Sequence, residues 1–450
     1  MIYFTLLELP KEQRKKKIYV VSSDTLVETP VVVDLLKNTM KMINESAADL
    51  GLPITAHAVH PKKDQTFWVN LLGRGYPAPR QQFRWCTERM KIDPVSTFIT
   101  ETVASHGEVI VVLGSRSQES SSRAQVVARH KIKGSKLSRH TTLHNAYTYM
   151  PIVDWSADDV WEYLMGAPCP WPGTNRQLFD LYRGSNQGEC PMVIDKSTPS
   201  CGNSRFGCWT CTVVQEDKAL HGLIEDGQVW MKPLLDFRNK LFVSTDPDKK
   251  SQYRNFKRRM GKVSYASGTI DNDVSAVKKH VPGPYWMKQR QSWLRELLEI
   301  ERDINLSGHE VDLIRFSELE EIRQQWLRDP NEPDWADSLP EIYSAVYPER
   351  NAIWVKNDFS AFQNEDLELL EEVSSNYNVS PAMIQKLVEV EIEISGLSQR
   401  RGVLNKLQLI LSKDWETLEE INERNEQTPN SDLWKEKIED FQNQLDELVR

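Results

Sequence analysis

Apolar and polar residues follow two alternating patterns along the first third of the chain. Residues 18–21, 54–59 and 109–113 are short, nearly continuous apolar runs rich in β-branched side chains, which predict strands buried on both faces. Residues 30–42 and 94–103 show helical spacing between these runs. Strands that alternate with helices imply a parallel α/β sheet.

Ligands of such a sheet bind beyond the carboxyl ends of its strands. We therefore expect a site among residues 22–30, 60–75 and 114–123, which follow the three strands directly. Residues 1–9 have the pattern of an amphipathic helix that Pro10 ends, without a capping residue ahead of it. A domain of this class normally has a strand and a loop before that helix, so we expect the sequence as given to begin inside its first helix.

The pattern changes after residue 168. Residues 169–290 are loop-rich and polar, with Pro, Gly and Asn between the cysteines, and we expect no large core of their own there. Residues 291–450 show helical spacing, for example at Leu294 and Leu297, in an acidic context. We predict an α/β domain at 1–168 that is incomplete at its N-terminus, a cysteine cluster and basic region at 169–290, and an all-helical domain at 291–450.

Composition narrows the class of protein. The 450 residues include 56 Lys and Arg against 65 Asp and Glu, for a net charge of −9, and 39% are hydrophobic, which excludes disorder over most of the length. The longest apolar runs fall far short of the roughly 20 residues that cross a bilayer. No basic region precedes the first run, as a signal peptide would require. We expect a cytoplasmic protein with no membrane partner and, at most, a local basic groove for nucleic acid.

Four of the six cysteines form the most specific motif. They have the spacing C-x10-C-x6-C-x2-C and are Cys190, Cys201, Cys208 and Cys211. A close C-x2-C pair with two more cysteines on the same loop can surround a metal or a cluster, and soft thiolates favour zinc or iron and sulfur. Spacing leaves a 4Fe-4S cluster, a zinc knuckle and a set of free core cysteines open, and favours the cluster. Cys169 lies outside the quartet and is interpreted as structural.

Two shorter segments add reactive groups. Asp24 and Thr25 follow the first strand, where a carboxylate and a hydroxyl suit ribose or metal-bound phosphate; an ordinary helix N-cap explains them equally well. Cys86 stands between Arg84 and Lys91, and neighbouring cations lower the pKa of a thiol. Cys86 is therefore the candidate reactive sulfur outside the quartet, with a buried inert cysteine as the alternative.

A third candidate segment follows the strand at 109–113. Gly114 allows the backbone to approach a ligand, and Arg116 and Arg123 can each donate two hydrogen bonds to a phosphate. Glu119 lies between the two arginines in sequence and can orient one of them. A polar loop with a surface salt bridge is the alternative.

Two basic runs stand out in a net acidic chain. Six cations lie between residues 123 and 139, and seven lie between 249 and 262, the latter with Tyr253 and Phe256 interleaved. Such runs can form a local footprint for a phosphodiester chain, or simply be solvated faces.

Taken together, these motifs resemble the phosphoadenylylsulfate reductase group of adenine nucleotide alpha hydrolases. The matching residues are 24–25, 84–87, 114–120, 151–155 and 159–161. The segment 200–213, Ser-Cys-Gly-Asn-Ser-Arg-Phe-Gly-Cys-Trp-Thr-Cys-Thr-Val, is more specific. It resembles the DndC family, the sulfurtransferase subunits of bacterial DNA phosphorothioation systems, and the likeness extends over most of the chain.

The resemblance implies an ATP pyrophosphatase-type fold that uses ATP with Mg, and a sulfurtransferase that replaces a non-bridging oxygen of a DNA phosphate. It implies a 4Fe-4S cluster held by Cys190, Cys201, Cys208 and Cys211. The implied partners are DNA, a cysteine desulfurase as sulfur donor, and other Dnd proteins in a modification complex. In this scheme Cys86, Arg116 and Arg123 are catalytic, and Asp24, Thr25, Gly114, Arg116 and Glu119 bind the nucleotide.

One departure keeps alternatives open. The family carries a Ser-Gly-Gly-Lys-Asp-Ser type loop for pyrophosphate just before the helix that Pro10 ends here, and the sequence contains no such loop. A reductase or RNA thiolase on the same scaffold, or an inactive scaffold with a structural zinc site, remain the rival interpretations. The reductase is disfavoured because residues 447–450 carry no reactive cysteine.

Overall fold

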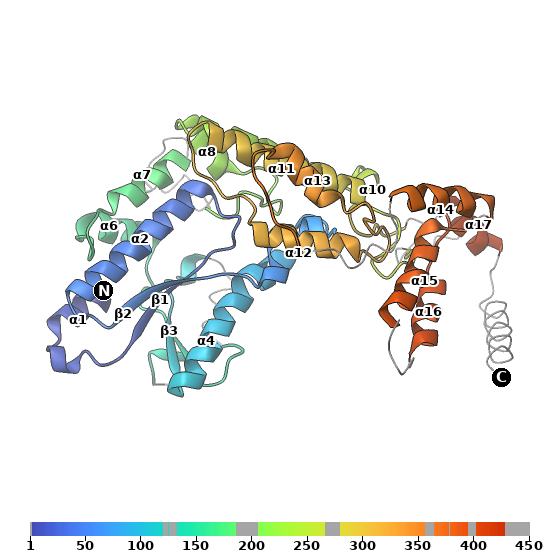
Figure 1. Ribbon diagram of the computed structural model, residues 1–450. Helices are drawn as coiled ribbons and strands as arrows, with labels where there is room; N and C mark the ends of the chain where they lie inside the picture. Colours follow the sequence, from blue (N-terminus) through green and yellow to red (C-terminus); the bar gives the residue numbers. More distant parts are fainter. Residues whose placement is uncertain are drawn as a thin grey trace, which may run out of the picture.

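The protein, described here by a computed structural model, has three parts (Figure 1). A sheet region (residues 2–185) lies at one end, a helical core (206–355) occupies the middle, and a group of C-terminal helices (364–427) lies at the other end. The residues that the structure describes are 2–119, 125, 132, 134–185, 206–265, 280–355, 364–377, 379–394 and 402–427.

The strands of the sheet region form two small sets. They are β1 (Ile18–Ser23), β2 (Ile54–Val59), β3 (Val109–Val112), β4 (Leu137–Arg139) and β5 (Ala146–Tyr149). β1 runs parallel to β2, with Ile18 opposite Ile54. β3 runs parallel to β5, and β4 runs antiparallel to β5. The three strands predicted from the sequence are confirmed, but the sheet is mixed rather than purely parallel, because β4 and β5 pair as an antiparallel ribbon.

The predicted burial of the strands on both faces is wrong for part of this region. Val20 of β1 is 38% exposed and Ile110 of β3 is 49% exposed. Among the described residues, β1 pairs only with β2, and β3 pairs only with β5. Each of these strands therefore has one edge without a ladder partner there.

Helices flank the strands in the order that the sequence pattern predicts (Figure 1). They are α1 (Ile2–Glu8), α2 (Pro30–Asp49), α4 (Asp93–His106), α6 (Ala157–Gly166) and α7 (Arg176–Ser185). Pro30 occupies the first turn of α2, where its missing N–H costs nothing. Ile43 of α2 and Leu6 of α1 pack together with Ile54 of β2 in a small apolar cluster.

The helical core contains more regular structure than the loop-rich pattern predicts. Its helices are α8 (Lys218–Glu225), α9 (Lys232–Val243), α10 (Lys250–Tyr253), α11 (Met287–Leu306), α12 (Phe316–Leu327) and α13 (Ser338–Val346). One apolar cluster joins these helices around Trp209 and Trp326, which are fully buried. α8 and α9 share this core with α11, which explains why residues 169–290 show no independent core.

A segment of the sheet region inserts into the helical core. Trp68 donates through Nε1 to the carbonyl oxygen of Leu313 over 2.7 Å, and Trp326 donates to that of Leu72 over 2.7 Å. The buried Arg290 guanidinium donates to the Gly73 carbonyl oxygen at 2.9 Å. The two parts are therefore joined by packing and by buried hydrogen bonds.

The C-terminal helices pack mainly against one another. They are α14 (Asn364–Asn376), α15 (Pro381–Ile394), α16 (Val403–Leu411) and α17 (Leu418–Gln427). Asp414 ties them to the helical core, because its Oδ2 accepts from the Val263 N–H and its own N–H donates to the Gly261 carbonyl oxygen.

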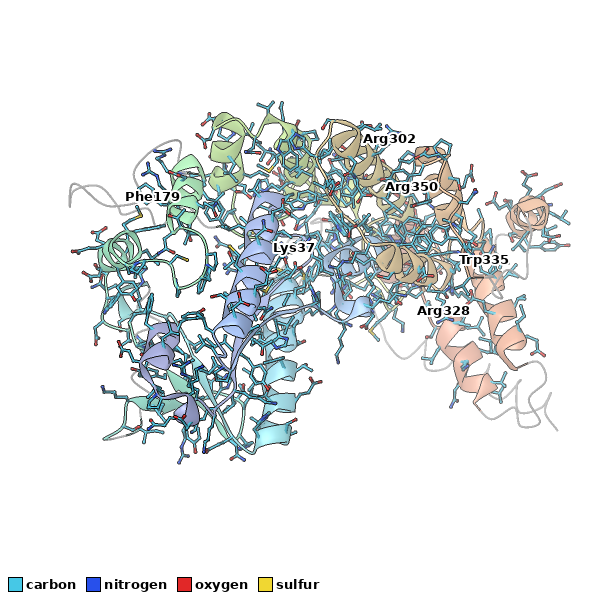
Figure 2. The ribbon with its side chains drawn as sticks, turned by 60° about the vertical axis from the view of Figure 1, so that its left-hand side comes forward. Lys37, Phe179, Arg302, Arg328, Trp335 and Arg350 are labelled. Atoms are coloured by element: carbon cyan, nitrogen blue, oxygen red, sulfur yellow. The ribbon has the colours of Figure 1, made fainter. Side chains whose placement is uncertain are left out.

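In Figure 2, Lys37 lies on α2 in the sheet region, whereas Arg302, Arg328, Trp335 and Arg350 lie in the helical core.

Short helical segments complete the described chain. They are η1 (Lys11–Gln13), η2 (Lys63–Gln65), η3 (Val69–Gly73), α3 (Trp85–Thr87), η4 (Glu88–Ile92), η5 (Ser117–Glu119) and η6 (Val229–Met231). Among the helices in the described ranges, none has both the length and the apolar character needed to span a bilayer.

Candidate functional site

The candidate site begins where β1 ends. The chain turns sharply there, because Asp24 Oδ1 accepts from the Leu26 N–H at 2.9 Å and Leu26 has a φ of 66°. The other carboxylate oxygen of Asp24 lies 3.4 Å from Nδ1 of His60, which follows β2. The carboxyl ends of the two parallel strands thus meet, as expected for a ligand-binding edge.

The C-x2-C segment lies directly against this turn. Trp209 donates its backbone N–H to the Val27 carbonyl oxygen at 2.9 Å, and the Thr29 N–H donates to that of Gly207 at 3.2 Å. The buried Trp209 side chain anchors the segment in the helical core. A hydrogen bond from the Cys211 N–H to the Cys208 carbonyl oxygen, 3.0 Å long, closes the turn between the two cysteines. Residues about 180 positions apart in sequence are therefore held as one unit.

Side-chain hydrogen bonds link the two segments. Thr25 donates its hydroxyl proton to Glu28 Oε1 at 2.9 Å. Cys208 Sγ lies 3.2 Å from Thr25 Oγ1, and the Cys208 thiol donates to the same Glu28 oxygen over 3.8 Å. Lys91 Nζ lies 3.7 Å from the same Glu28 oxygen. We call Thr25, Glu28, Cys86, Lys91, Cys208 and Cys211 the thiol group.

Cys86 belongs to the thiol group through electrostatics rather than through a hydrogen bond to another thiol. Burial, and then the neighbouring Cys211, raise the pKa of Cys86. The predicted lowering of this pKa is therefore wrong, because burial and the second sulfur outweigh the neighbouring Lys91. The pKa of Lys91 is raised: burial lowers it, but Cys208, Glu28, Cys86 and Cys211 together outweigh burial.

The Cys208 thiol is buried beside a carboxylate. Burial, and then Glu28, raise its pKa well above the ordinary range. A thiol in this position stays protonated unless a positive centre binds its sulfur, and a metal ion or an iron–sulfur cluster is such a centre. The donor set of Cys208 and Cys211 therefore fits a soft metal centre. Within the described ranges, no three Cys, His, Asp or Glu side chains converge closely enough to hold a metal ion by themselves.

The remaining predicted site residues fall into two sets. Gly114 and Arg116 follow β3, in a loop fixed by a hydrogen bond from the Ser117 N–H to the Val153 carbonyl oxygen at 2.8 Å, and Glu119 ends η5. The hydrogen bonds that join Thr25 to Glu28 and to Cys208 do not involve this loop. The other set, Arg123, Cys190 and Cys201, lies outside the described residues.

The basic run at 249–262 is only partly available to a ligand. Arg254 donates to the carbonyl oxygens of Gly283 and Pro282 at 2.7 and 2.5 Å. Lys257 lies 5.8 Å from the centre of the Trp415 ring, and burial lowers its pKa. Arg258 and Arg259 are exposed. In the other basic run, Lys136 and Arg139 are exposed at β4, and the remaining cations lie outside the described residues.

Sequence reasoning missed Glu28 of the thiol group and identified Lys91 only as a cation near Cys86. Lys91 had a signal, because it lies five residues after Cys86 in the same short helical stretch. Glu28 had none, since its contact with Cys208 depends on pairing between distant segments.

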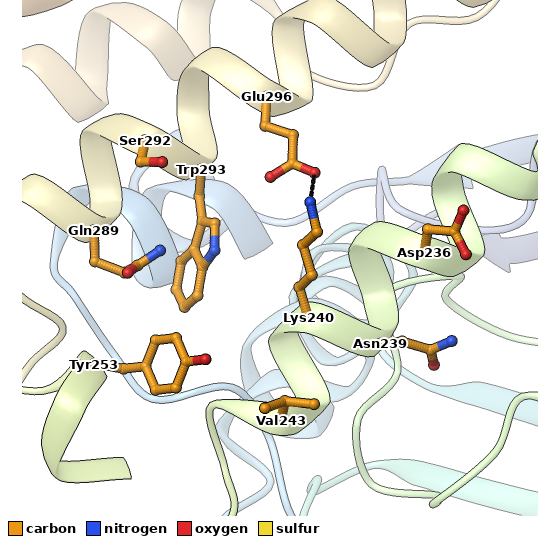
Figure 3. A pocket seen from close by; sticks show the side chains of 9 residues that line it. All are labelled: Asp236, Asn239, Lys240, Val243, Tyr253, Gln289, Ser292, Trp293 and Glu296. Carbon is orange, nitrogen blue, oxygen red and sulfur yellow. Dashed lines mark hydrogen bonds and ion pairs between the residues drawn. The ribbon is translucent and has the colours of Figure 1, made fainter. Parts of the chain in front are cut away.

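A separate pocket lies in the helical core (Figure 3). It has a volume of about 410 Å³ and lies between α9, α10 and α11, away from the thiol group. The Lys240–Glu296 ion pair crosses it, and Tyr253 faces Trp293. Its lining is Asp236, Asn239, Lys240, Val243, Tyr253, Gln289, Ser292, Trp293 and Glu296. None of the predicted site residues lines it.

One known protein family matches a segment that contains both the turn after β1 and the C-x2-C pair. Residues 7–214 match the phosphoadenosine phosphosulfate reductase domain. Members of this family are enzymes that act on nucleotide substrates in sulfur metabolism. The match begins before β1 and ends just after Cys211, so this reductase-like domain includes all six residues of the thiol group.

Two curated relatives are similar over part of this chain. The uncharacterized protein MJ0066 of Methanocaldococcus jannaschii is 27% identical over 165 residues, which is 37% of this chain and 29% of the relative. The uncharacterized protein MJ0973 of the same organism is 26% identical over 145 residues, 32% of this chain and 29% of the relative. The matched segment therefore spans less than a third of each relative.

Proposed function

We propose that the protein is a nucleotide-dependent sulfurtransferase of the DndC type, which replaces a non-bridging oxygen of a DNA phosphate by sulfur. The observation that carries the proposal is the contact between Cys208 and Thr25. It joins a cysteine motif to the turn after β1, where a parallel sheet binds its ligand. In this proposal, sulfur chemistry and nucleotide chemistry share one edge of the reductase-like domain.

The proposed reaction has two steps. A non-bridging oxygen of the DNA phosphate attacks the α-phosphorus of ATP and pyrophosphate leaves, which converts a poor leaving group into AMP. Hydrosulfide then attacks the DNA phosphorus, AMP leaves with the oxygen, and the thiol proton is released. A cysteine desulfurase supplies the sulfur as a persulfide, and a thiol reductant converts that persulfide to hydrosulfide. Other Dnd proteins select the DNA site in this proposal.

The chain's own residues have distinct roles in this scheme. Asp24 would hold Mg bound to the phosphates of ATP, and the Thr25 hydroxyl would contact the ribose or a phosphate. Arg116 and Arg123 would stabilise the charge that develops on phosphate oxygens. Gly114 and Glu119 would place the nucleotide and orient an arginine. Lys91 carries a positive charge among the thiols, which favours anionic sulfur beside it.

The proposed cofactor is a 4Fe-4S cluster. Cys208 and Cys211 would hold it together with Cys190 and Cys201, and such a cluster would supply electron-transfer chemistry close to the site of sulfur transfer. Cys86, whose pKa responds to Cys211, would lie at its border.

A sulfur-transfer assay tests the proposal. The purified chain is incubated with duplex DNA, ATP, Mg, a cysteine desulfurase, cysteine and a thiol reductant, and the digested DNA is analysed by mass spectrometry for phosphorothioate dinucleotides. We expect ATP-dependent incorporation that Cys208→Ser abolishes. Cys169→Ser is the matched control, because Cys169 is half-buried and lies outside the thiol group.

Two results would contradict the proposal. Sulfur that appears in tRNA but not in DNA would assign the chain to an RNA thiolase. Equal incorporation by the wild type and by Cys208→Ser would separate the C-x2-C pair from the chemistry.

A further inference from the structure

Arginine side chains gather around Tyr76, beside the thiol group. The Arg89 guanidinium lies 4.9 Å from the centre of the Tyr76 ring, and that of Arg259 lies 5.7 Å from it. Burial raises the pKa of Tyr76, but the hydrogen bond and charge of Arg89, followed by Arg259 and Arg74, outweigh burial and lower it. The local field is therefore strongly positive in a chain whose net charge is −9.

Few carboxylates neutralise this field. Arg74 lies 3.4 Å from Asp64, and Arg74 and Arg89 both donate to Asn70 Oδ1, which is a neutral acceptor. Asp329, an acid whose charge acts on Arg259, is already paired with Arg290 at 2.8 Å. Arg89 and Arg259 thus have an aromatic ring and an amide as partners where an anion would bind more strongly.

A tight turn adds two more arginines at the surface. The Arg80 N–H donates to the Phe83 carbonyl oxygen at 3.2 Å, and the Phe83 N–H donates back at 2.9 Å. Arg80 and Arg84 are exposed, and within the described residues neither side chain has a hydrogen bond or an ion pair. Phe83 between them is 42% exposed.

This turn is attached to the cysteine motif and to the second basic run. The Thr212 hydroxyl, next to Cys211, donates to the Pro79 carbonyl oxygen at 2.6 Å. On the other side, burial lowers the pKa of Arg254 to about 10, and Arg258 and Arg80 contribute to the lowering, so these three guanidinium groups are close neighbours. Residues from two separate parts of the chain therefore form one positive surface. We call Arg80, Phe83, Arg84, Arg89, Arg258 and Arg259 the arginine surface.

We infer that the arginine surface binds the phosphodiester backbone of a polynucleotide, with the Phe83 ring against a base or sugar. Guanidinium groups without carboxylate partners bind phosphate with two hydrogen bonds each, and exposed aromatic rings among them stack on bases. The Thr212–Pro79 contact places the bound backbone beside Cys211. The identity of this polynucleotide as DNA rests on the proposed function. The inference that the surface binds a polynucleotide rests on the contacts described above.

The test uses a charge-matched pair of double variants of the full chain. Arg80→Gln with Arg84→Gln removes two cations from the arginine surface without removing a contact inside the protein. Lys15→Gln with Lys16→Gln removes the same charge from two exposed residues that precede β1, at the opposite edge of the sheet from Asp24. Binding of fluorescein-labelled 20-residue single-stranded and duplex DNA, and of RNA of the same sequence, is measured over a series of salt concentrations.

We expect the arginine variant to lose about tenfold or more in affinity near 0.1 M salt, and its log–log salt slope for duplex DNA to shrink by about 1.8. The lysine variant should keep the wild-type slope. Phe83→Ala should weaken the binding of single-stranded DNA by a further several-fold and leave the salt slope unchanged, because stacking releases no counterions. Affinity for ATP alone should stay unchanged in all variants.

Several outcomes would overturn the inference. Equal losses in the two double variants would show a general charge effect, and a parallel loss of ATP affinity would assign the surface to a free nucleotide. A wild type that binds no polynucleotide would also overturn it. By contrast, a selective loss with RNA but no binding of DNA would support the surface and refute the DNA part of the proposed function. If the arginine variant incorporates sulfur into DNA as well as the wild type and binds DNA with unchanged affinity, the proposed function is supported and the arginine surface is refuted.

Discussion

The sheet region and the helical core contrast in how they bury apolar side chains. In the helical core, Trp326 and Leu297 are fully buried, and one continuous cluster joins all its major helices. In the sheet region, Val20, Ile110 and Leu113 remain 38–49% exposed although they lie in or next to strands. The largest buried cluster of the sheet region proper consists of a few side chains around Ile43 and Ile54.

The two regions therefore have different roles. The helical core has enough buried apolar surface to be stable by packing, and it fixes Trp209 and with it the C-x2-C segment. The sheet region contributes the ligand-binding edge at β1 but obtains less stabilisation per residue from burial. We therefore expect the sheet region to open more readily than the helical core and to gain more from ligand binding.

The largest effect should come from breaking the buried ion pair of the helical core. Arg290 and Asp329 are 2.8 Å apart and almost completely buried. Asp329→Ala leaves the Arg290 charge without its partner, so the free energy of unfolding should fall by about 3–5 kcal/mol in urea titrations. Asp329→Asn keeps the acceptor oxygen and should lose less. A loss below about 1 kcal/mol for Asp329→Ala would contradict a large contribution of this ion pair to stability.

A leucine in each region provides a direct comparison. Leu297→Ala creates a cavity in α11 and should cost about 3 kcal/mol, whereas Leu113→Ala, just after β3, should cost less than about 1 kcal/mol because its side chain is 39% exposed. Unfolding monitored by tryptophan fluorescence measures both. Similar losses at the two positions would contradict the contrast between the regions.

A smaller effect is expected from pH. Burial raises the pKa of Glu301, although hydrogen bonds from Tyr347, Leu313 and Ile314 oppose the shift. The stability that a protonated Glu301 contributes is present below its unfolded-state pKa and is lost as pH rises through its raised folded-state pKa. Glu301→Gln removes this titration, so the stability of the variant relative to the wild type should rise as the pH increases above the ordinary glutamate pKa of 4.5.

The chemistry at position 301 permits this substitution. A glutamine oxygen can accept from the Leu313 and Ile314 N–H groups, while its amide can donate to the Tyr347 hydroxyl. Unfolding measured at several pH values for both proteins gives the difference directly. A difference that stays constant over the whole range would show that Glu301 does not titrate in this way.

Much of the fold was predictable because it depends on local pattern. β1, β2 and β3 follow from runs of β-branched residues, α2 begins at Pro30, and α11 follows from its apolar spacing. β4 and β5 were not predicted, because Leu137–Arg139 is too short and too polar to stand out. α8 and α9 were missed because their apolar faces are paired with residues far away in sequence, such as Trp68.

The site was predictable to the extent that single motifs carry it. Asp24, Thr25, Cys86, Cys208 and Cys211 were identified from sequence, and the structure brings all of them to the end of β1 or against its turn. Their electrostatics were not predictable, since the raised pKa of Cys86 comes from burial and from Cys211, 125 positions away. Of the arginine surface, only Arg258 and Arg259 were identified, within the basic run at 249–262, because the surface combines two segments that are distant in sequence.

The most direct test of the account is the metal content of the chain purified without oxygen. The proposed 4Fe-4S cluster predicts about four iron atoms and a matching amount of acid-labile sulfide per chain, with a broad visible absorbance that Cys208→Ser removes and Cys169→Ser retains. Stoichiometric zinc without iron, or iron that persists unchanged in Cys208→Ser, would contradict it.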